Sequence, residues 1–218
     1  MPELYIITGS NGAGKSTIGP DFLPNQIRQN CTVFDGDLLF MRKRSELYIS
    51  GIKSHKECKK LAFAWLTEYF DELVETAISK NTDFCYEGHF TNEATWDIPR
   101  KFKEAGYKIH LIFFGLKDTA LSELRVVARK EEGGHYVDPI TVADNFYGNL
   151  EKLDKHFHIF DSVQIYDTSE MVYQLLVGLE DDLLVFAVPS EHLPPWVTAN
   201  MPNMTQKLIS KEVSGNSI

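Results

Sequence analysis

The residues from Gly9 to Ser16 fit the pattern G-x-x-x-x-G-K-[ST] of a phosphate-binding loop. Its glycines let the backbone approach a phosphate closely, because no Cβ stands in the way. Successive backbone N–H groups form a nest for an anion, and a following helix adds the positive end of its dipole. In such loops the lysine, here Lys15, reaches the β- and γ-phosphates, and the hydroxyl, here that of Ser16, binds Mg²⁺. The pattern predicts a nucleoside triphosphate site made of Gly9, Ser10, Asn11, Gly12, Ala13, Gly14, Lys15, Ser16 and Thr17.

Two acidic residues follow further apolar runs. Asp37 comes after residues 32–34, and Glu87 comes after residues 83–86. Phosphoryl transfer needs a group that accepts the proton of the attacking hydroxyl, and Asp37 is our candidate for this general base. The alternative is that Asp37 is a helix N-cap, in which case Asp35 becomes the candidate base. Glu87 either binds the acceptor or orients the ligands of Mg²⁺.

Arg125 and Arg129 are four residues apart and face the same side of an expected helix. Two cations placed this way repel each other, so a phosphate is a plausible partner for them. The alternative is pairing with nearby acidic residues, namely Glu123, Glu131 and Glu132. Gly133 and Gly134 would let the segment at about 125–140 move as a lid that excludes water from the site.

Apolar runs alternate with helical patterns along the chain. Strands are expected at 4–8, 32–34, 83–86, 107–114 and 163–166. Helices are expected at 55–80, 93–104, 118–130 and 141–156. Five strands that alternate with helices indicate an α/β fold, with a mostly parallel sheet flanked by helices on both faces. The longest helix carries an apolar stripe that predicts core packing: Ala62, Leu66, Phe70, Leu73 and Ala77.

The C-terminal part of the chain has a different pattern. Residues 173–188 contain two apolar runs around an acidic turn, which predicts a β-hairpin appended to the sheet. Residues 1–200 are expected to form a single domain. The composition becomes polar after Trp196, so residues 201–218 are expected to be a flexible tail.

The topology indicates where the chemistry should be. Ligands of parallel sheets bind outside the carboxyl ends of the strands. The phosphate loop, Asp37, Glu87 and the helix with both arginines each follow a different strand, so we expect them to meet at one edge. His89 also follows a strand and is either part of the site or a loop histidine with a structural role. His110 lies inside a strand and is expected to be structural.

Composition limits the partners. The net charge of −9 over 218 residues argues against a surface that binds nucleic acid. The three cysteines lack metal-binding spacing and are expected to be reduced thiols of a cytoplasmic protein. No secretion signal begins the sequence, and no apolar run approaches the ~20 residues of a membrane span.

These residues together resemble the zeta-toxin-like kinases, in particular a stand-alone branch described as predicted ABC-type ATPases. The resemblance covers about residues 3–197. It rests on the loop 9–17, Asp37, Glu87-Gly88, Arg125, Arg129 and the lid motif Gly133-Gly134-His135. The resemblance implies a P-loop kinase fold that uses ATP and Mg²⁺. No LSGGQ-like signature of the ABC transporters occurs in the sequence.

The family's known roles can be carried over to matching positions. The resemblance implies that Asp37 is the base, that Glu87 binds the acceptor, and that Arg125 and Arg129 are the lid arginines. In zeta toxins the acceptor is UDP-N-acetylglucosamine, which is phosphorylated on a ring hydroxyl. A threonine that helps to hold it is replaced here by His89, so the acceptor stays open. An antitoxin partner is equally open.

Our hypothesis from the sequence is therefore phosphoryl transfer from ATP, with Mg²⁺, to a hydroxyl of a small molecule, with a UDP-amino sugar as one candidate. The first alternative is a kinase for another acceptor, such as a nucleoside or an antibiotic. The second is a nucleotide-hydrolysing switch without an acceptor. A guanine-specific NKxD sequence would favour the switch, and none occurs.

Overall fold

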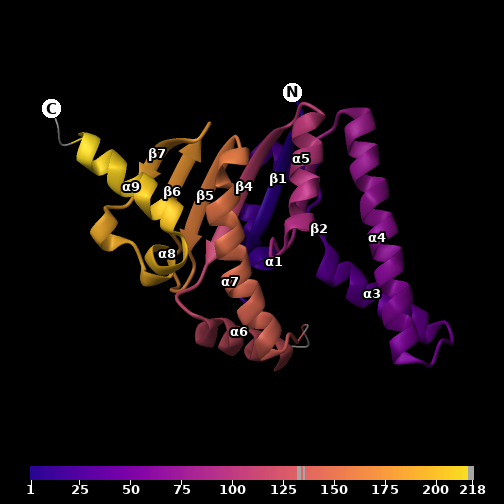
Figure 1. The fold of residues 1–218 in the computed structure, drawn as a ribbon. Coiled ribbons are helices and arrows are strands. Elements are labelled where there is room, and N and C mark those ends of the chain that lie inside the picture. The colour runs from indigo at the N-terminus through magenta and orange to yellow at the C-terminus, as the bar shows by residue number, and fades with distance from the viewer. Residues whose placement is uncertain (132–133, 135, 216–218) are drawn as a thin grey trace.

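A computed structural model describes residues 1–131, 134 and 136–215 of the chain. Its described strands form one sheet in the order β2-β3-β1-β4-β5-β6-β7 (Figure 1). The strands are β1 (Glu3–Gly9), β2 (Phe34–Asp35), β3 (Phe84–Glu87), β4 (Lys108–Gly115), β5 (Ser162–Asp167), β6 (Gln174–Glu180) and β7 (Leu183–Ala187). The first five run parallel, and β6 and β7 are antiparallel. This confirms the predicted five-stranded parallel sheet with an appended hairpin.

Helices flank the sheet. They are α1 (Lys15–Ile18), α2 (Asn25–Asn30), α3 (Gly36–Ile49), α4 (His55–Lys80), α5 (Asp97–Glu104), α6 (Thr119–Glu131), α7 (Pro139–His156), α8 (Pro195–Asn200) and α9 (Pro202–Gly215). Short 3-10 helices occupy Gly19–Phe22, Glu93–Trp96, Phe157–Ile159 and Ser190–His192. In Figure 1, α5 and α7 cross one face of the sheet, and α3 and α4 form a pair beside the β2 edge. No described helix is both long and apolar enough to cross a membrane.

The core centres on β1 and β4, which lie in the middle of the sheet. Leu4, Ile6 and Ile7 of β1 are fully buried or nearly so, and so are Phe113 and Phe114 of β4. Strands covered on both faces need side chains that are apolar on both sides, which is why these two segments read as continuous apolar runs in the sequence.

The long helix α4 begins and ends with capping residues. The Ser54 hydroxyl accepts a hydrogen bond from the Glu57 N–H, and Asn81 takes a left-handed conformation (φ 54°) after the last turn. Ala62 and Ala77 of the predicted stripe are buried in the core. The stripe is not core along its whole length, however, since Leu66 lines a pocket described below.

The prediction of a flexible polar tail from residue 201 is wrong for residues 201–215. Pro202–Gly215 forms α9, and Met201, Met204 and Leu208 are buried in the core. The first turn of α9 is held by Asp154 of α7, whose carboxylate accepts hydrogen bonds from backbone N–H groups of α9, including that of Met204 at 2.8 Å. Three well-spaced apolar residues thus anchor a segment whose composition is mostly polar.

Candidate active site

The phosphate loop leaves β1 with a backbone that only glycine tolerates. A Cβ at Gly9 (φ 135°) would lie 2.0 Å from the carbonyl oxygen of Phe114 in the adjacent β4. A Cβ at Gly12 (φ 73°) would lie 2.8 Å from the Cβ of Arg125. The loop is therefore packed between β4 and α6, with its position fixed by backbone contacts.

Lys15 lies at the start of α1 and is buried, at 6% exposure. Its Nζ donates hydrogen bonds to the carbonyl oxygens of Gly9 (3.1 Å) and Ser10 (3.0 Å). Burial lowers the pKa of Lys15, while the carboxylates of Glu87 and Asp37 act in the opposite direction. The ammonium group is thus held by the loop itself and by two nearby acids.

A cavity of about 310 Å³ opens in front of this loop, and we call it the phosphate cavity. Its lining consists of Asn11, Gly12, Gly14, Lys15, Ser16, Thr17, Asp37, Glu87, Arg125, Ala128 and Arg129. These residues come from the loop after β1, the first turn of α3 after β2, the end of β3, and α6 after β4. Side chains from four separate segments therefore meet at the carboxyl edge of the parallel strands, as the topology predicts.

Ser16 and Glu87 form an oxygen-rich pair in this cavity. The Ser16 hydroxyl donates a hydrogen bond of 3.0 Å to Oε1 of Glu87. The second oxygen, Oε2, is buried and has no hydrogen-bond partner among the described residues. Burial raises the pKa of Glu87, and Lys15 and Ser16 partly offset this effect. A hydroxyl and an unpaired carboxylate oxygen are hard donors that suit Mg²⁺, so these residues fit that ion.

A protein usually provides only one or two carboxylate ligands to Mg²⁺. No group of three or more His, Cys, Asp or Glu side chains suited to a metal occurs within the described part of the chain. Nucleotide-dependent enzymes commonly hold Mg²⁺ through one or two carboxylates together with the phosphates of the substrate. The Ser16 hydroxyl and the Glu87 carboxylate are donors of the kind that such sites use.

The two aspartates near β2 have different positions. Asp35 is the N-cap of α3, and its carboxylate accepts a hydrogen bond of 2.9 Å from the Leu38 N–H. Asp37 lies one residue into the first turn and lines the phosphate cavity. The alternative that Asp37 is the N-cap is therefore wrong, because Asp35 has that role.

The two arginines of α6 both line the cavity. Arg125 also donates hydrogen bonds to the carbonyl oxygens of Thr168 and Ser169, each at 2.8 Å, and to that of Gly12 at 3.4 Å. Its guanidinium group thus ties the phosphate loop to the segment after β5. The lid motif at 133–135 lies largely outside the described residues, which include only Gly134 from it.

His89 belongs to a polar network that the sequence did not reveal. Asn149 of α7 donates a hydrogen bond of 3.0 Å to Nδ1 of His89. The same side chain accepts hydrogen bonds from the Phe90 N–H (2.6 Å) and the Thr8 hydroxyl (3.3 Å). Burial, followed by the charge of Lys15, holds the pKa of His89 well below its ordinary value, so the imidazole is neutral.

The network also reaches the phosphate loop. Asn145, one turn before Asn149, donates a hydrogen bond of 2.8 Å to the side-chain oxygen of Asn11. Two asparagines four residues apart on an otherwise apolar helix face were the available signal in the sequence. His110, by contrast, stacks on Tyr5 at 4.5 Å and contacts Ser162, which agrees with the expected structural role.

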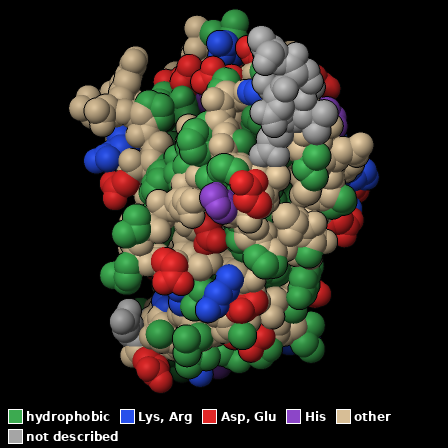
Figure 2. Space-filling model, turned by 90° about the vertical axis from the view of Figure 1, so that its left-hand side faces the viewer, with side chains coloured by type: hydrophobic (Ala, Val, Ile, Leu, Met, Phe, Trp, Pro, Cys, Tyr) green, Lys and Arg blue, Asp and Glu red, His purple; other side chains and the backbone are tan. Residues whose placement is uncertain are grey.

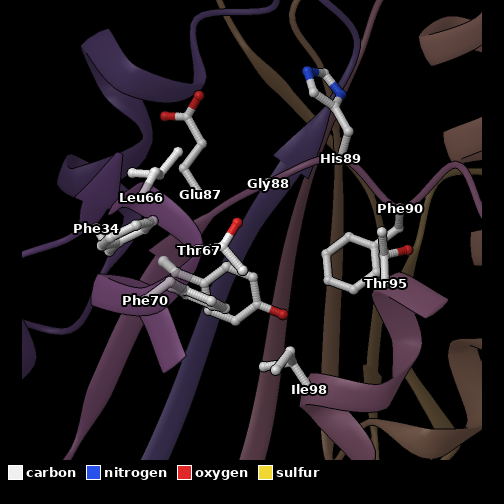
Figure 3. A pocket seen from close by; sticks show the side chains of 11 residues that line it. Phe34, Leu66, Thr67, Phe70, Glu87, Gly88, His89, Phe90, Thr95 and Ile98 are labelled. Atoms are coloured by element: carbon white, nitrogen blue, oxygen red, sulfur yellow. The ribbon is translucent and has the colours of Figure 1, made fainter. Parts of the chain in front are cut away.

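A second cavity of about 270 Å³ lies next to the first, and we call it the apolar pocket. It is lined by Phe34, Leu66, Thr67, Phe70, Tyr86, Glu87, Gly88, His89, Phe90, Thr95 and Ile98. Figure 3 shows Phe34, Leu66 and Phe70 on one side, Phe90 and Ile98 on the other, and Glu87 and His89 together at one end. Glu87 lines both cavities, so the two spaces are adjacent at this residue.

The outer surface seen from the β7 side carries mixed charges. On this face, the Lys and Arg side chains of the described residues lie scattered among acidic ones (Figure 2). A nucleic acid backbone binds to clustered cations, so this face does not offer such a surface.

The sheet order, the phosphate loop and the acidic residues at the strand ends define an α/β protein with the fold of the P-loop kinases. A family model described as "Zeta toxin" matches residues 1–175, and the chain belongs to this family. The family predicted from the sequence is thereby confirmed. No curated protein matches the chain significantly.

Two solved structures share the fold at low sequence identity. One comes from the PezAT chromosomal toxin–antitoxin system of the human pathogen Streptococcus pneumoniae. It has 19% identity and a TM-score of 0.57, with 97% of this chain and 87% of that chain covered. The other is the AvrRxo1-ORF1:-ORF2 complex with ATP. It has 16% identity and a TM-score of 0.64, with 84% of this chain and 60% of that chain covered. The chain thus spans less than two thirds of the second structure's length.

Proposed function

We propose that this protein transfers the γ-phosphoryl group of ATP to a hydroxyl group of a small molecule, with Mg²⁺ as the metal ion. The observation that carries the proposal is that Glu87 lines both the phosphate cavity and the apolar pocket. A transferase needs two substrate sites that touch, whereas a nucleotide-hydrolysing switch needs only the first. Membership of the zeta toxin family and the ATP in the AvrRxo1 complex support the choice of nucleotide.

The residues divide the work as follows. The loop amides and Lys15 hold the phosphates. Ser16 and Glu87 would hold the metal ion, which would neutralise charge on the phosphates. Asp37 accepts the proton as the acceptor oxygen forms its bond to the γ-phosphorus. The bond from that phosphorus to the bridging oxygen breaks, and ADP leaves with the electron pair. Arg129 stabilises the charge on the group in transfer, and Arg125 fixes the phosphate loop through its hydrogen bonds to the carbonyl oxygens of Gly12, Thr168 and Ser169.

The neutral His89 and its network have a positioning role in this scheme. Asn145 and Asn149 of α7 hydrogen-bond to Asn11 of the phosphate loop and to His89, and all of these side chains are uncharged. His89 also lines the apolar pocket, so it contacts both Asn149 of the polar network and the proposed acceptor site.

The identity of the acceptor is a separate question from the reaction type. Membership of the zeta toxin family makes UDP-N-acetylglucosamine the first compound to test. Nucleosides and antibiotics with free hydroxyls are the next candidates. The PezAT structure comes from a toxin–antitoxin system, so we also infer that a protein partner of the antitoxin type is worth testing by co-purification.

The test is transfer of a labelled γ-phosphate to compounds of a metabolite pool, read by mass spectrometry. Asp37→Asn should lower the rate of transfer by about 10²–10⁴-fold, because general base catalysis contributes that much. It should leave the dissociation constant of ATP nearly unchanged. Asp71→Asn, a matched change at an exposed position of α4, is the control. ATP turnover that no acceptor stimulates would favour the switch, and a large loss of ATP affinity in Asp37→Asn would assign it a different role.

A further inference from the structure

We propose that the apolar pocket selects an uncharged, ring-containing alcohol as the acceptor and excludes a nucleoside diphosphate from the same space. This inference rests on the proposed function, and it concerns the chemistry of the second substrate. It is carried by the side chains that line the pocket, by the positions of the cations, and by one buried hydroxyl group.

Four Phe and Tyr rings are among the described residues that line the pocket. Phe34 and Phe70 have their ring centroids 4.8 Å apart, Phe70 and Tyr86 are 5.6 Å apart, and Tyr86 and Phe90 are 6.2 Å apart. The rings form a continuous surface that Leu66 and Ile98 complete (Figure 3). Such a surface binds the flat or apolar face of a ring through the hydrophobic effect and stacking.

The charges in the pocket disfavour an anionic ligand. Of the described residues that line it, none is Lys or Arg. Its other groups that can ionise are the carboxyl group of Glu87, the imidazole of His89 and the phenol of Tyr86. A diphosphate placed here would lose its hydration without meeting a cation, which is costly. The cations Lys15, Arg125 and Arg129 line the phosphate cavity instead, where ATP needs them.

One polar group in the wall is without a partner. Tyr86 is 6% exposed, and its hydroxyl is buried with no hydrogen-bond partner among the described residues. A buried hydroxyl that makes no hydrogen bond is unfavourable, so the wall of the pocket contains one unsatisfied polar group.

The volume limits the size of the ligand. About 270 Å³ is slightly below the range of roughly 300–1,000 Å³ that is typical of small-molecule sites. One substituted ring fits this space better than a UDP-amino sugar, in which a diphosphate links a sugar to a nucleoside. The acceptor of this protein would thus differ from a UDP-amino sugar in charge and in size.

The experiment compares acceptors that share a ring and differ in charge. Transfer of labelled phosphate is measured with N-acetylglucosamine and UDP-N-acetylglucosamine as one pair, with uridine and UDP as a second pair, and with 2-phenylethanol. We expect kcat/KM for the neutral member of a pair to exceed that for the charged member at least tenfold. A tenfold preference for the charged members would overturn the inference while leaving the proposed function in place.

A variant tests whether the pocket is the place of selection. Thr67 lines the pocket and is exposed, so Thr67→Lys adds a cation there without removing a core side chain. Ala64→Lys adds the same charge to the same helix at an exposed position outside the pocket. Thr67→Lys should lower kcat/KM for the neutral acceptors at least tenfold and leave ATP affinity and melting temperature unchanged. Ala64→Lys should leave all of these unchanged.

The remaining outcomes are also decisive. Equal effects of Thr67→Lys and Ala64→Lys on transfer would overturn the assignment of the acceptor to this pocket. If no compound accepts phosphate although ATP binds in a manner that requires Lys15, the proposed function fails, and the inference fails with it.

Discussion

Replacing Asn149 by leucine tests whether the polar network behind the phosphate loop holds the site together. Leucine has the same branching at Cγ but neither donates nor accepts hydrogen bonds. Asn149 is 1% exposed and hydrogen-bonds four groups, belonging to Thr8, His89, Phe90 and Asn145. The change removes all four hydrogen bonds and puts an apolar side chain of similar shape in the place of the amide.

The magnitude follows from the groups left behind. The N–H of Phe90 and the Nδ1 of His89 lose their partner, whereas the Thr8 hydroxyl can rotate to another acceptor. A buried group without a partner costs about 1–3 kcal/mol, so two such groups lower the free energy of unfolding by about 2–6 kcal/mol. This is a large part of the roughly 5–15 kcal/mol by which domains are stable.

The assay is urea unfolding with linear extrapolation, applied also to Asn145→Leu as a matched control. Asn145 is half-buried and donates a single side-chain hydrogen bond, to Asn11, which water can replace. Its loss should cost about 1 kcal/mol or less. Equal destabilisation by the two leucine variants would refute the reasoning, since it would mean that the buried groups around Asn149 find other partners.

Three further predictions concern the metal, the pH dependence and the C-terminal helix. Ser16→Ala should raise the Mg²⁺ concentration for half-maximal transfer by about tenfold or more in an Mg²⁺ titration, and an unchanged titration would exclude Ser16 as a ligand. Hydrogen bonds from two lysines lower the pKa of Glu93 from 4.5 to about 2, so the stability that Glu93 contributes is present above pH 4.5 and is lost as the pH falls towards 2. Glu93→Gln should flatten this part of a stability–pH curve, and an identical curve would contradict the assignment. Met204→Ala should lower the free energy of unfolding by about 2–5 kcal/mol, because Met204 is fully buried, whereas Met171→Ala, at a 94% exposed position, should not change it.

The sequence predicted the sheet because its signal is local. Continuous apolar runs mark strands that are buried on both faces, and helical stripes between them indicate crossovers. The helix α9 was missed because its signal is sparse. Met201, Met204 and Leu208 are spread through polar residues, and their burial depends on Asp154, which is about fifty positions away in the chain. Composition alone cannot reveal an anchor of that kind.

The candidate site followed from one topological rule, that ligands lie at the carboxyl ends of parallel strands. This rule predicts that the phosphate loop, Asp37 and Glu87 lie together, and all three line the phosphate cavity. It could not rank Asp35 against Asp37, because a shift of two residues in the start of α3 decides which of them is the N-cap. Nor could it find Asn149, whose role depends on partners in two other segments.

Arg125 illustrates how residue type and position can indicate a location without indicating a role. Its spacing from Arg129 predicted two cations facing a phosphate, and both do line the phosphate cavity. Yet the guanidinium group of Arg125 donates to three carbonyl oxygens, two in the segment after β5 and one in the phosphate loop. An arginine has five N–H donors, so those already used to hold the loop cannot also follow a moving phosphoryl group. Arg125 therefore acts on the reaction chiefly by fixing the loop. We propose Arg129 as the arginine that stabilises negative charge on the phosphoryl group during transfer.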